Sequence, residues 1–383
     1  MPQVSAGDGA AVVPAYRREA AFFVLAGTAV VFAALGKHRL AGGVETWIGA
    51  LMFAWLFVVI ILGAMSVVRH ADCLASRLGE PYGTMILTLA VASIEIMTIG
   101  IVMTTGDPNP ALARDTMFSV LMIVLNGLVG VALLLGGLRY REQEYNLQGV
   151  NAYLSVIVVL SVFGLIVPNL TLSIAAGTFS RGQEIFLIVM CVGLYAVFLA
   201  IQTTRHRTFF LDRLDEVPAA GGASVAHDPL LGVRSTPYHA LLLAVDLGLV
   251  IFLAEKLAIL LDHGIETLGA PPALGALAVA ILVLAPEGLA GIQAARANRM
   301  QRAVNILLGS VLATLALTIP AVVIIGLAQG SNVVLGLDRV EEAMLVLTLL
   351  VSMLTFASGR TNVLQGAVHL MLFLSYLMLL VLR

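Results

Sequence analysis

The chain has 383 residues, of which 60% are hydrophobic and 11% charged, with a mean hydropathy of +1.01 and a formal net charge of −2. Soluble domains contain about 45–50% apolar residues, so this composition excludes an ordinary soluble protein. The near-neutral charge and scattered basic residues argue against nucleic-acid binding, and Cys73 and Cys191 provide neither a disulfide framework nor a metal-ligand pair. We expect an integral membrane protein whose partner is the lipid bilayer.

A window of about 20 residues locates the apolar segments long enough to cross a bilayer. The first is expected to be a retained helix, because no small-residue cleavage site follows it. The runs are continuously apolar, which excludes alternating barrel strands. The predicted fold class is therefore all-α, a polytopic membrane protein of about 11 transmembrane helices. The expected helices are 20–36, 47–68, 83–105, 116–138, 152–168, 184–204, 238–261, 271–293, 303–326, 341–358 and 361–382.

A polar stretch at 205–237, rich in small residues, divides the chain and is interpreted as a flexible linker. A regulatory cation site built from its acidic and histidine side chains is the alternative. The predicted domains are an N-terminal tail with the first helix at 1–46, a first five-helix repeat at 47–204 and a second at 238–383. Because five is odd, the second repeat enters the membrane from the opposite side, which makes the repeats inverted.

Orientation follows from the distribution of Lys and Arg. Fourteen of the 21 lie in the N-terminal tail and in alternate loops, including those with Arg139, Arg205 and Arg296. Cytoplasmic loops of membrane proteins carry an excess of these residues. We therefore expect the N-terminus in the cytoplasm, the linker on the same side, and the C-terminus outside.

Two carboxylates lie deep inside apolar runs. Glu95 is in the expected third helix and Glu287 in the eighth, at matching places in the two halves. A charge inside a bilayer is costly and marks a functional site by default, although a structural buried pair is an alternative. Since the two helices are expected to be antiparallel, the glutamates can meet near the midplane.

Small polar side chains follow the glutamates at helical spacing. Ser119 lies 24 residues after Glu95, and Ser310 lies 23 residues after Glu287. Packing or interhelical hydrogen bonding is the alternative role for any one of these residues. The predicted lining of the site consists of Thr88, Ser119, Asn126, Ser310 and Thr314.

Three further residues bear on the site. Pro286 removes a backbone hydrogen bond and frees a carbonyl beside Glu287, which a cation could use. Asp246, in the seventh expected helix, is a candidate guard of the inner mouth. His369, in the last helix, is expected to be a hydrogen-bonded helix residue rather than a proton carrier.

Two glutamates would balance the charge of one divalent cation, and Ca²⁺ takes about six to eight oxygen ligands. Soft metals prefer Cys or His, which do not cluster here. Burial favours a protonated carboxylate, whereas a bound cation favours the ionised form, so protons and a cation would compete for the same oxygens. Exchange would then need no second site and no cofactor.

At these residues the sequence resembles the calcium/cation antiporter superfamily, in particular its bacterial calcium (sodium, potassium)/proton antiporter branch. The resemblance is carried by Gly79–Thr84 leading to Glu95, and by Leu284–Gly288 leading through Ala294–Asn298 to Ser310. It implies that Glu95 and Glu287 bind the cation. It further implies that Ser119 and Ser310 occupy the family's Gly-Ser elements.

The resemblance has departures. The family's Gly-Asn pair is replaced by Val91-Ala92 and by Val283-Leu284, and Thr314 stands where calcium/proton exchangers often have Gln. Side-chain amide ligands are thus missing, which leaves the choice among Ca²⁺, Na⁺ and K⁺ open.

The function implied is that of a secondary transporter in the bacterial inner membrane, exchanging cytosolic Ca²⁺ for protons. Na⁺/H⁺ or K⁺/H⁺ exchange at the same site is the alternative. An ion channel would need a filter, and an intramembrane enzyme a nucleophile with a base, and neither pattern stands out. The sequence leaves the oligomeric state open.

Overall fold

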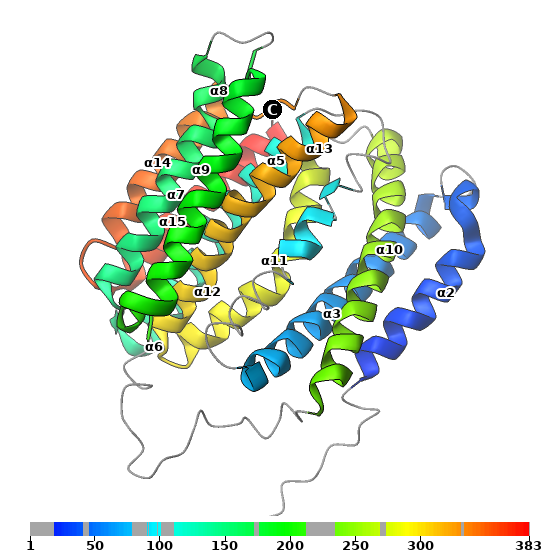
Figure 1. The fold of residues 1–383 in the computed structure, drawn as a ribbon, viewed down its shortest axis with the longest axis horizontal. Coiled ribbons are helices and arrows are strands. Elements are labelled where there is room, and N and C mark those ends of the chain that lie inside the picture. Colours follow the sequence, from blue (N-terminus) through cyan, green and yellow to red (C-terminus); the bar gives the residue numbers. More distant parts are fainter. Residues whose placement is uncertain are drawn as a thin grey trace, which may run out of the picture.

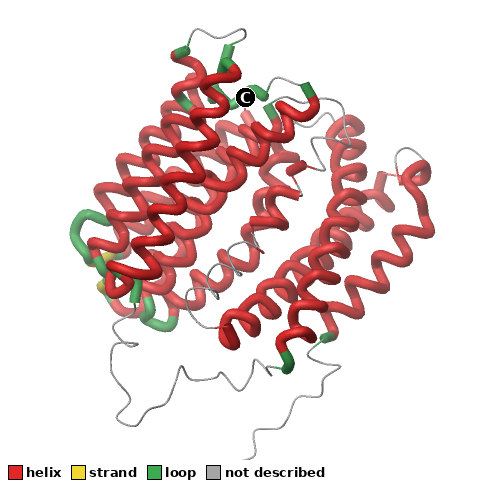
Figure 2. Tube along the Cα trace, in the orientation of Figure 1, coloured by secondary structure: helices red, strands yellow, loops and turns green. Residues whose placement is uncertain are grey.

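The computed structural model describes residues 19–40, 46–78, 90, 92–97, 99–100, 111–171, 176–211, 234–268, 273–330 and 333–382. Its elements are almost all helices (Figures 1 and 2). The α-helices are α2 Ala20–Leu40, α3 Thr46–Leu78, α5 Leu112–Met122, α6 Val129–Tyr140, α7 Leu147–Leu165, α8 Val167–Leu170, α9 Arg181–Ala200, α10 Thr236–Leu268, α11 Ala273–Arg296, α12 Met300–Ala313, α13 Ile319–Gln329, α14 Arg339–Thr355 and α15 Val363–Leu382. Shorter elements are the π-helices η1 Ile123–Leu128, η2 Ile201–Arg205 and η4 Thr314–Thr318, the 3₁₀-helix η3 Arg207–Phe209, and the strands β1 Gln143–Glu144 and β2 Arg360–Thr361.

The predicted all-α membrane class is confirmed. Within the described ranges, seven helical segments are long and apolar enough to cross a membrane. A helix also overlaps each expected range, and within 83–105 the structure describes only residues 90, 92–97 and 99–100, all of them helical. The total of 11 helices and the inverted repeats stay predictions.

Two long helices contain a π-helical segment in their middle. α5, η1 and α6 form one helix, and α12, η4 and α13 form another. The segment η1 begins 28 residues after Glu95, and η4 begins 27 residues after Glu287. A π-segment inside an α-helix often marks a functional site, because it displaces side chains from the regular helical face. Both halves carry this feature at nearly the same interval from their glutamate.

The helices α2, α3 and α10 form a layer of their own, on the right in Figure 1. Their buried side chains include Leu25, Ile60 and Leu253, and Ile94, next to Glu95, packs into the same cluster. A Cβ on Gly63 of α3 would lie 2.7 Å from a methyl carbon of Val250 on α10, so this close packing requires glycine. Small residues permit such close helix approach in membranes, where burial from water does not drive association.

The other helices pack into a larger bundle around a continuous apolar core. The helices α6 and α15 approach closely, since a Cβ on Gly366 would lie 2.5 Å from the backbone nitrogen of Leu134. The helix α11 lies between the two layers, because it contacts α3 on one side and α5, α6 and α12 on the other. This position places Glu287 where the layers meet.

Loops far apart in sequence meet at one end of the bundle. The strands β1 and β2 pair antiparallel, with Gln143 opposite Thr361. Nearby, the Tyr140 hydroxyl donates to the backbone oxygen of Arg296 at 2.9 Å. The loops that follow α6, α11 and α14 therefore lie on the same side, as the charge distribution predicts. Which side faces the cytoplasm stays a prediction.

Candidate cation site

A cavity of about 480 Å³ lies where α11, α12, α9 and the segment around Glu95 meet. Both predicted glutamates line it, as do Ser310 and Thr314 of the predicted lining. The structure therefore brings together four of the side chains that the sequence singles out. Glu95 precedes the other three by 192 to 219 residues in the chain.

Glu95 is buried, with 4% of its surface exposed. The Thr314 hydroxyl donates a hydrogen bond to Glu95 Oε2 at 2.8 Å. The other oxygen, Oε1, is buried and has no hydrogen-bond partner among the described residues, and neither does the hydroxyl of Thr318, one turn beyond Thr314. An unpartnered carboxylate oxygen is costly in a low-dielectric interior, so this atom needs a proton or a cation.

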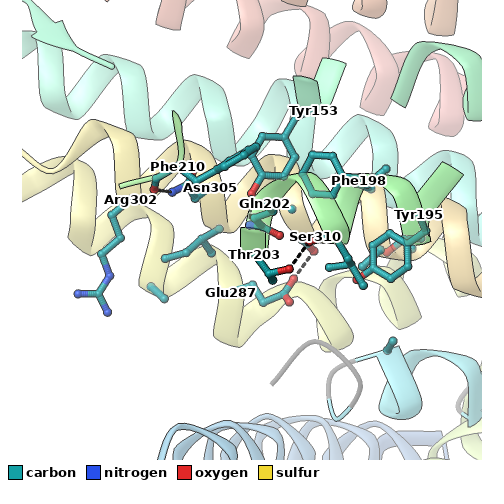
Figure 3. A pocket seen from close by; sticks show the side chains of 18 of the residues that line it. Tyr153, Tyr195, Phe198, Gln202, Thr203, Phe210, Glu287, Arg302, Asn305 and Ser310 are labelled. Atoms are coloured by element: carbon teal, nitrogen blue, oxygen red, sulfur yellow. Dashed lines mark hydrogen bonds between the residues drawn. The ribbon is translucent and has the colours of Figure 1, made fainter. Parts of the chain in front are cut away.

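Glu287 and Ser310 point toward each other in the same cavity (Figure 3). The Ser310 hydroxyl donates to Glu287 Oε2. Pro286, immediately before it, lies inside α11, and the helix continues through it. Ser310 and Thr314 lie one helical turn apart on the single helix formed by α12 and η4. This helix therefore donates one hydroxyl to each glutamate.

The outer part of the cavity has an aromatic wall. The rings of Tyr153, Phe198 and Phe210 form a cluster with centroid distances of 4.8 to 5.7 Å. The Asn305 side chain donates to the backbone oxygen of Phe210 at 2.6 Å and thereby fixes the segment after α9 against α12 (Figure 3). Arg207 and Arg302 also line the cavity. It therefore extends from the glutamates to the basic end of the bundle.

The sequence analysis missed this wall. Its residues are ordinary aromatic and amide side chains in apolar helices, and nothing in their spacing distinguishes them from core residues. The signal that could have indicated the wall is Asn305, a polar residue five positions before Ser310 in α12.

Three residues of the predicted lining are not found at the cavity. Thr88 lies outside the described residues. Ser119 is buried, donates to the backbone oxygen of Asp115 and pairs with the Tyr376 hydroxyl at 2.8 Å. Asn126 is also absent from the cavity lining. Any role of these three in cation binding stays a prediction.

Asn126 belongs to a separate polar cluster. Its amide donates to Thr348 on α14 at 2.8 Å, and its Oδ1 lies 3.3 Å from His369 Nδ1 on α15. The other ring nitrogen of His369 lies 3.0 Å from the hydroxyl of Thr355. His369 is thus a hydrogen-bonded helix residue, as expected, and this cluster joins three helices away from the cavity.

Asp246 does not line the cavity either. It is fully buried between α10 and α3, where it accepts a hydrogen bond of 2.6 Å from Ser66. The interpretation of Asp246 as a guard of the inner mouth is therefore wrong for this structure, because its side chain points to the neighbouring helix α3.

Comparison with known proteins identifies the family. The family model for "Sodium/calcium exchanger protein" matches residues 48–204 and 238–382, which is most of the chain. The chain belongs to this family. It is accordingly a member of the calcium/cation antiporter superfamily, a multi-pass membrane transporter and not an enzyme.

The similar curated proteins differ in the cations that they are named for. The sodium-potassium/proton antiporter ChaA of Escherichia coli (strain K12) is 41% identical over 324 residues, covering 83% of this chain and 86% of that protein. The Ca²⁺/H⁺ antiporter ChaA of Bacillus subtilis (strain 168) is 22% identical over 350 residues, covering 90% and 94%.

Solved structures share the fold. Native YfkE matches with a TM-score of 0.72 at 18% identity, covering 95% of this chain and 100% of that one. The H⁺/Ca²⁺ exchanger CAX matches with a TM-score of 0.68 at 12% identity, covering 94% and 88%. At these identities the likeness establishes the exchanger fold alone.

Proposed function

We propose that the protein is a secondary antiporter that exchanges a cytosolic cation for protons, with both ions competing for Glu95 and Glu287. The observation that carries the proposal is the cavity that both carboxylates line, with one buried carboxylate oxygen lacking a partner among the described residues. Such an arrangement suits a site that always holds either protons or a cation. Membership of the exchanger family supports it.

The surrounding hydroxyls fit this competition. Ser310 and Thr314 each donate to a glutamate, so they stabilise the ionised carboxylates and offset part of the cost of burial. Their oxygens, together with that of Thr318, are also hard ligands that a cation accepts. When protons neutralise the carboxylates, the electrostatic attraction for the cation is lost.

Inverted repeats would explain why one site can open to either side. The family model matches two separate segments that correspond closely to the expected repeats, and each half carries a glutamate followed by a π-segment at nearly the same interval. In transporters with inverted repeats, access alternates as one group of helices moves against another around a central site. The layer of α2, α3 and α10 is the moving group in our proposal, because it packs separately from the main bundle.

The cavity in this structure reaches Arg207 and Arg302, which belong to the loops assigned to the cytoplasm by their charge. We take this as an inward-facing arrangement in a bacterial inner membrane, with the N-terminus in the cytoplasm and the C-terminus outside. A cytosolic cation would enter past the aromatic wall and displace protons from the glutamates.

Ca²⁺ is the first candidate for the cation, because two carboxylates balance its charge and the oxygen donors suit a hard ion. Na⁺ or K⁺ exchange is the second candidate. It is favoured by the 41% identity to a relative named as a sodium-potassium/proton antiporter, and by the replacement of the family's Gly-Asn amides by Val91-Ala92 and Val283-Leu284.

The test is proton flux in everted vesicles that contain this protein and have an acid interior. Ca²⁺, Na⁺ and K⁺ are added separately across a series of external pH values. We expect the cation to make the lumen more alkaline, and Glu95→Gln and Glu287→Gln each to abolish the response. Glu142→Gln is the matched control, because that exposed carboxylate pairs with Arg360 at the end of the bundle, away from the cavity.

A response to Ca²⁺ alone supports the first candidate, and a response to Na⁺ or K⁺ supports the second. Undiminished exchange by both glutamine variants at the cavity would refute the site, whichever cation is transported.

A further inference from the structure

Two histidines meet between α3 and α10, in the layer beside the cavity. His70 is fully buried and His239 is 1% exposed. Their Nδ1 atoms lie 2.8 Å apart, which is a hydrogen bond between the two helices at the end where α10 begins. The sequence analysis did not identify this pair, because the residues are 169 positions apart.

Charged and polar groups surround the pair from every packed element. Just before α2, Glu19 Oε2 lies 3.4 Å from His70 Nε2. On α10, Asp246 Oδ2 lies 3.9 Å from the same nitrogen, and on α3 the Arg69 Nη2 atom lies 3.1 Å from it. Other groups facing the pair are Ser66, which donates to Asp246, Tyr238, whose ring lies against both imidazoles, and the guanidinium groups of Arg77 and Arg234.

Two neutral rings cannot satisfy all three contacts of the pair, because the Arg69 Nη2 donor also lies 3.1 Å from His70 Nε2. When the Arg234 contact and the contact between the rings are made, the protons of the neutral pair have one arrangement. The backbone N–H of Arg234 donates to His239 Nε2 at 2.8 Å, so that nitrogen carries no proton. Neutral His239 therefore has its proton on Nδ1 and donates to His70 Nδ1. His70 then carries its own proton on Nε2, which faces Glu19 and Asp246. Arg69 directs its own donor to Glu19.

An additional proton cannot enter this arrangement without breaking it. The two ring nitrogens that lack protons both accept hydrogen bonds, one from the Arg234 backbone and one from the partner ring. Protonation of His239 Nε2 places its N–H group against the backbone N–H of Arg234. Protonation of His70 Nδ1 places its N–H group against the Nδ1–H of His239, between the two helices. The second case removes the bond that joins α3 to α10.

A metal ion does not explain the pair. Two imidazole nitrogens bound to one Zn²⁺ at about 2.0–2.1 Å in tetrahedral geometry would be separated by about 3.3 Å, which exceeds the observed 2.8 Å. No group of three or more metal-ligating side chains occurs in the part of the chain that the structure describes.

We propose that the His70–His239 pair is a second proton-binding site, separate from the glutamates, through which cytoplasmic acid loosens α3 from α10 and slows exchange. Val68, two residues before His70, lines the cavity, so a displacement of this end of α3 changes the cavity wall. Asp246 Oδ1 is buried and without a partner among the described residues, and it can accept an N–H group released by the rearrangement. The effect on exchange rests on the proposed function, but the effect on the helices does not.

The transport test measures the maximal rate at saturating cation while the pH on the cytoplasmic face varies and the pH on the other face is fixed. Saturation removes competition at the glutamates, so a remaining loss of rate reports the second site. We expect the wild-type rate to fall by about tenfold per pH unit below the midpoint, as for one titrating group.

His239→Gln is the decisive variant. Glutamine can accept from the Arg234 backbone and donate to His70, and it does not take up a proton. If His70 becomes protonated, the glutamine amide can turn and accept from its Nδ1–H, so the bond between α3 and α10 is kept in acid. We expect this variant to lose the acid limb, which is the fall in maximal rate at low cytoplasmic pH. Its maximal rate should fall less than twofold over the same pH range. His263→Gln, which changes a histidine at the other end of α10, is the matched control and should keep the acid limb. An acid limb of wild-type depth in His239→Gln would overturn the proposal.

A structural measurement keeps the inference testable if no exchange is detected. Spin labels at Met65 and Leu241, which are exposed and uncharged on α3 and α10, report the separation of the helices. The native cysteines, Cys73 and Cys191, are first replaced by serine. We expect the distance to change between pH 8 and pH 5 with His239 present and to stay constant in His239→Gln. A distance that does not depend on pH in the presence of His239 would overturn the proposal, even if exchange is absent.

Discussion

Thr314→Val removes a hydroxyl that donates to Glu95 while preserving the branched shape of the side chain. Thr314 is 2% exposed and begins the π-segment η4, and its hydroxyl lies 2.8 Å from Glu95 Oε2. The hydrogen bond stabilises the ionised carboxylate more than the protonated one. In the proposed function the cation binds the ionised form, so the substitution should favour the proton in the competition.

The magnitude follows from the kind of bond. A buried hydrogen bond to a charged group contributes about 1.5–3 kcal/mol, and about 1.4 kcal/mol corresponds to a factor of ten. The half-saturating cation concentration should therefore rise about 10- to 100-fold at neutral pH. The difference in half-saturating concentration between the variant and the wild type should disappear at alkaline pH, where protons no longer compete. The maximal rate should change less than the half-saturating concentration does.

The assay is proton flux in everted vesicles at graded cation concentrations and several pH values. Ser161→Ala is the control, because Ser161 is also fully buried and its hydroxyl has no partner among the described residues, so its loss should leave the half-saturating concentration unchanged. A half-saturating concentration for Thr314→Val within twofold of the wild-type value at every pH would refute the reasoning.

Two further predictions concern stability. Gly366→Leu should lower the thermal unfolding midpoint in detergent by several degrees or prevent folding, because its Cβ would lie 2.5 Å from the backbone nitrogen of Leu134. Gly182→Leu is the control and should leave the midpoint unchanged, because the space around Gly182 is open. Equal midpoints for the two variants would contradict the packing argument. For Glu19, burial opposes ionisation, yet hydrogen bonding and attraction from Arg69 lower the pKa of the carboxyl group below its ordinary 4.5. Its stabilisation is present above that value and is lost as the pH falls through the lowered pKa of the folded protein. Glu19→Gln should therefore cost about 1 kcal/mol at pH 7, and this deficit should shrink progressively in melts taken further below pH 4.5.

The sequence was a good guide to features that depend on one helix. Continuous apolar runs predicted the helices, and the isolation of Glu95 and Glu287 in such runs indicated the site. Ser310 and Thr314 were found because both lie on the same face, one turn apart. The hydrophobic character of a segment and the position of a charge within it are local properties, which the sequence states directly.

Features that depend on the choice of neighbour were not predictable in this way. Ser119 and Asn126 share a helical face, but periodicity does not say which helix that face contacts, and here Asn126 contacts α14 and α15. Asp246 was noticed as a buried charge, but its approach to His70 depends on the packing of α3 against α10. Partners from distant segments become visible only when the helices are arranged in space.

The π-segment at Thr314–Thr318 gives α12 and α13 a property that a regular helix lacks. A π-turn holds one residue more than an α-turn, so moving it along the helix by one position rotates the intervening side chains by about 100° and leaves both flanking helices in place. For this helix, such a shift would exchange the hydroxyl presented to Glu95 while Ser310 stays on Glu287. The coordination of one carboxylate could then be altered by local rewinding, independently of the other and without any large displacement of the bundle.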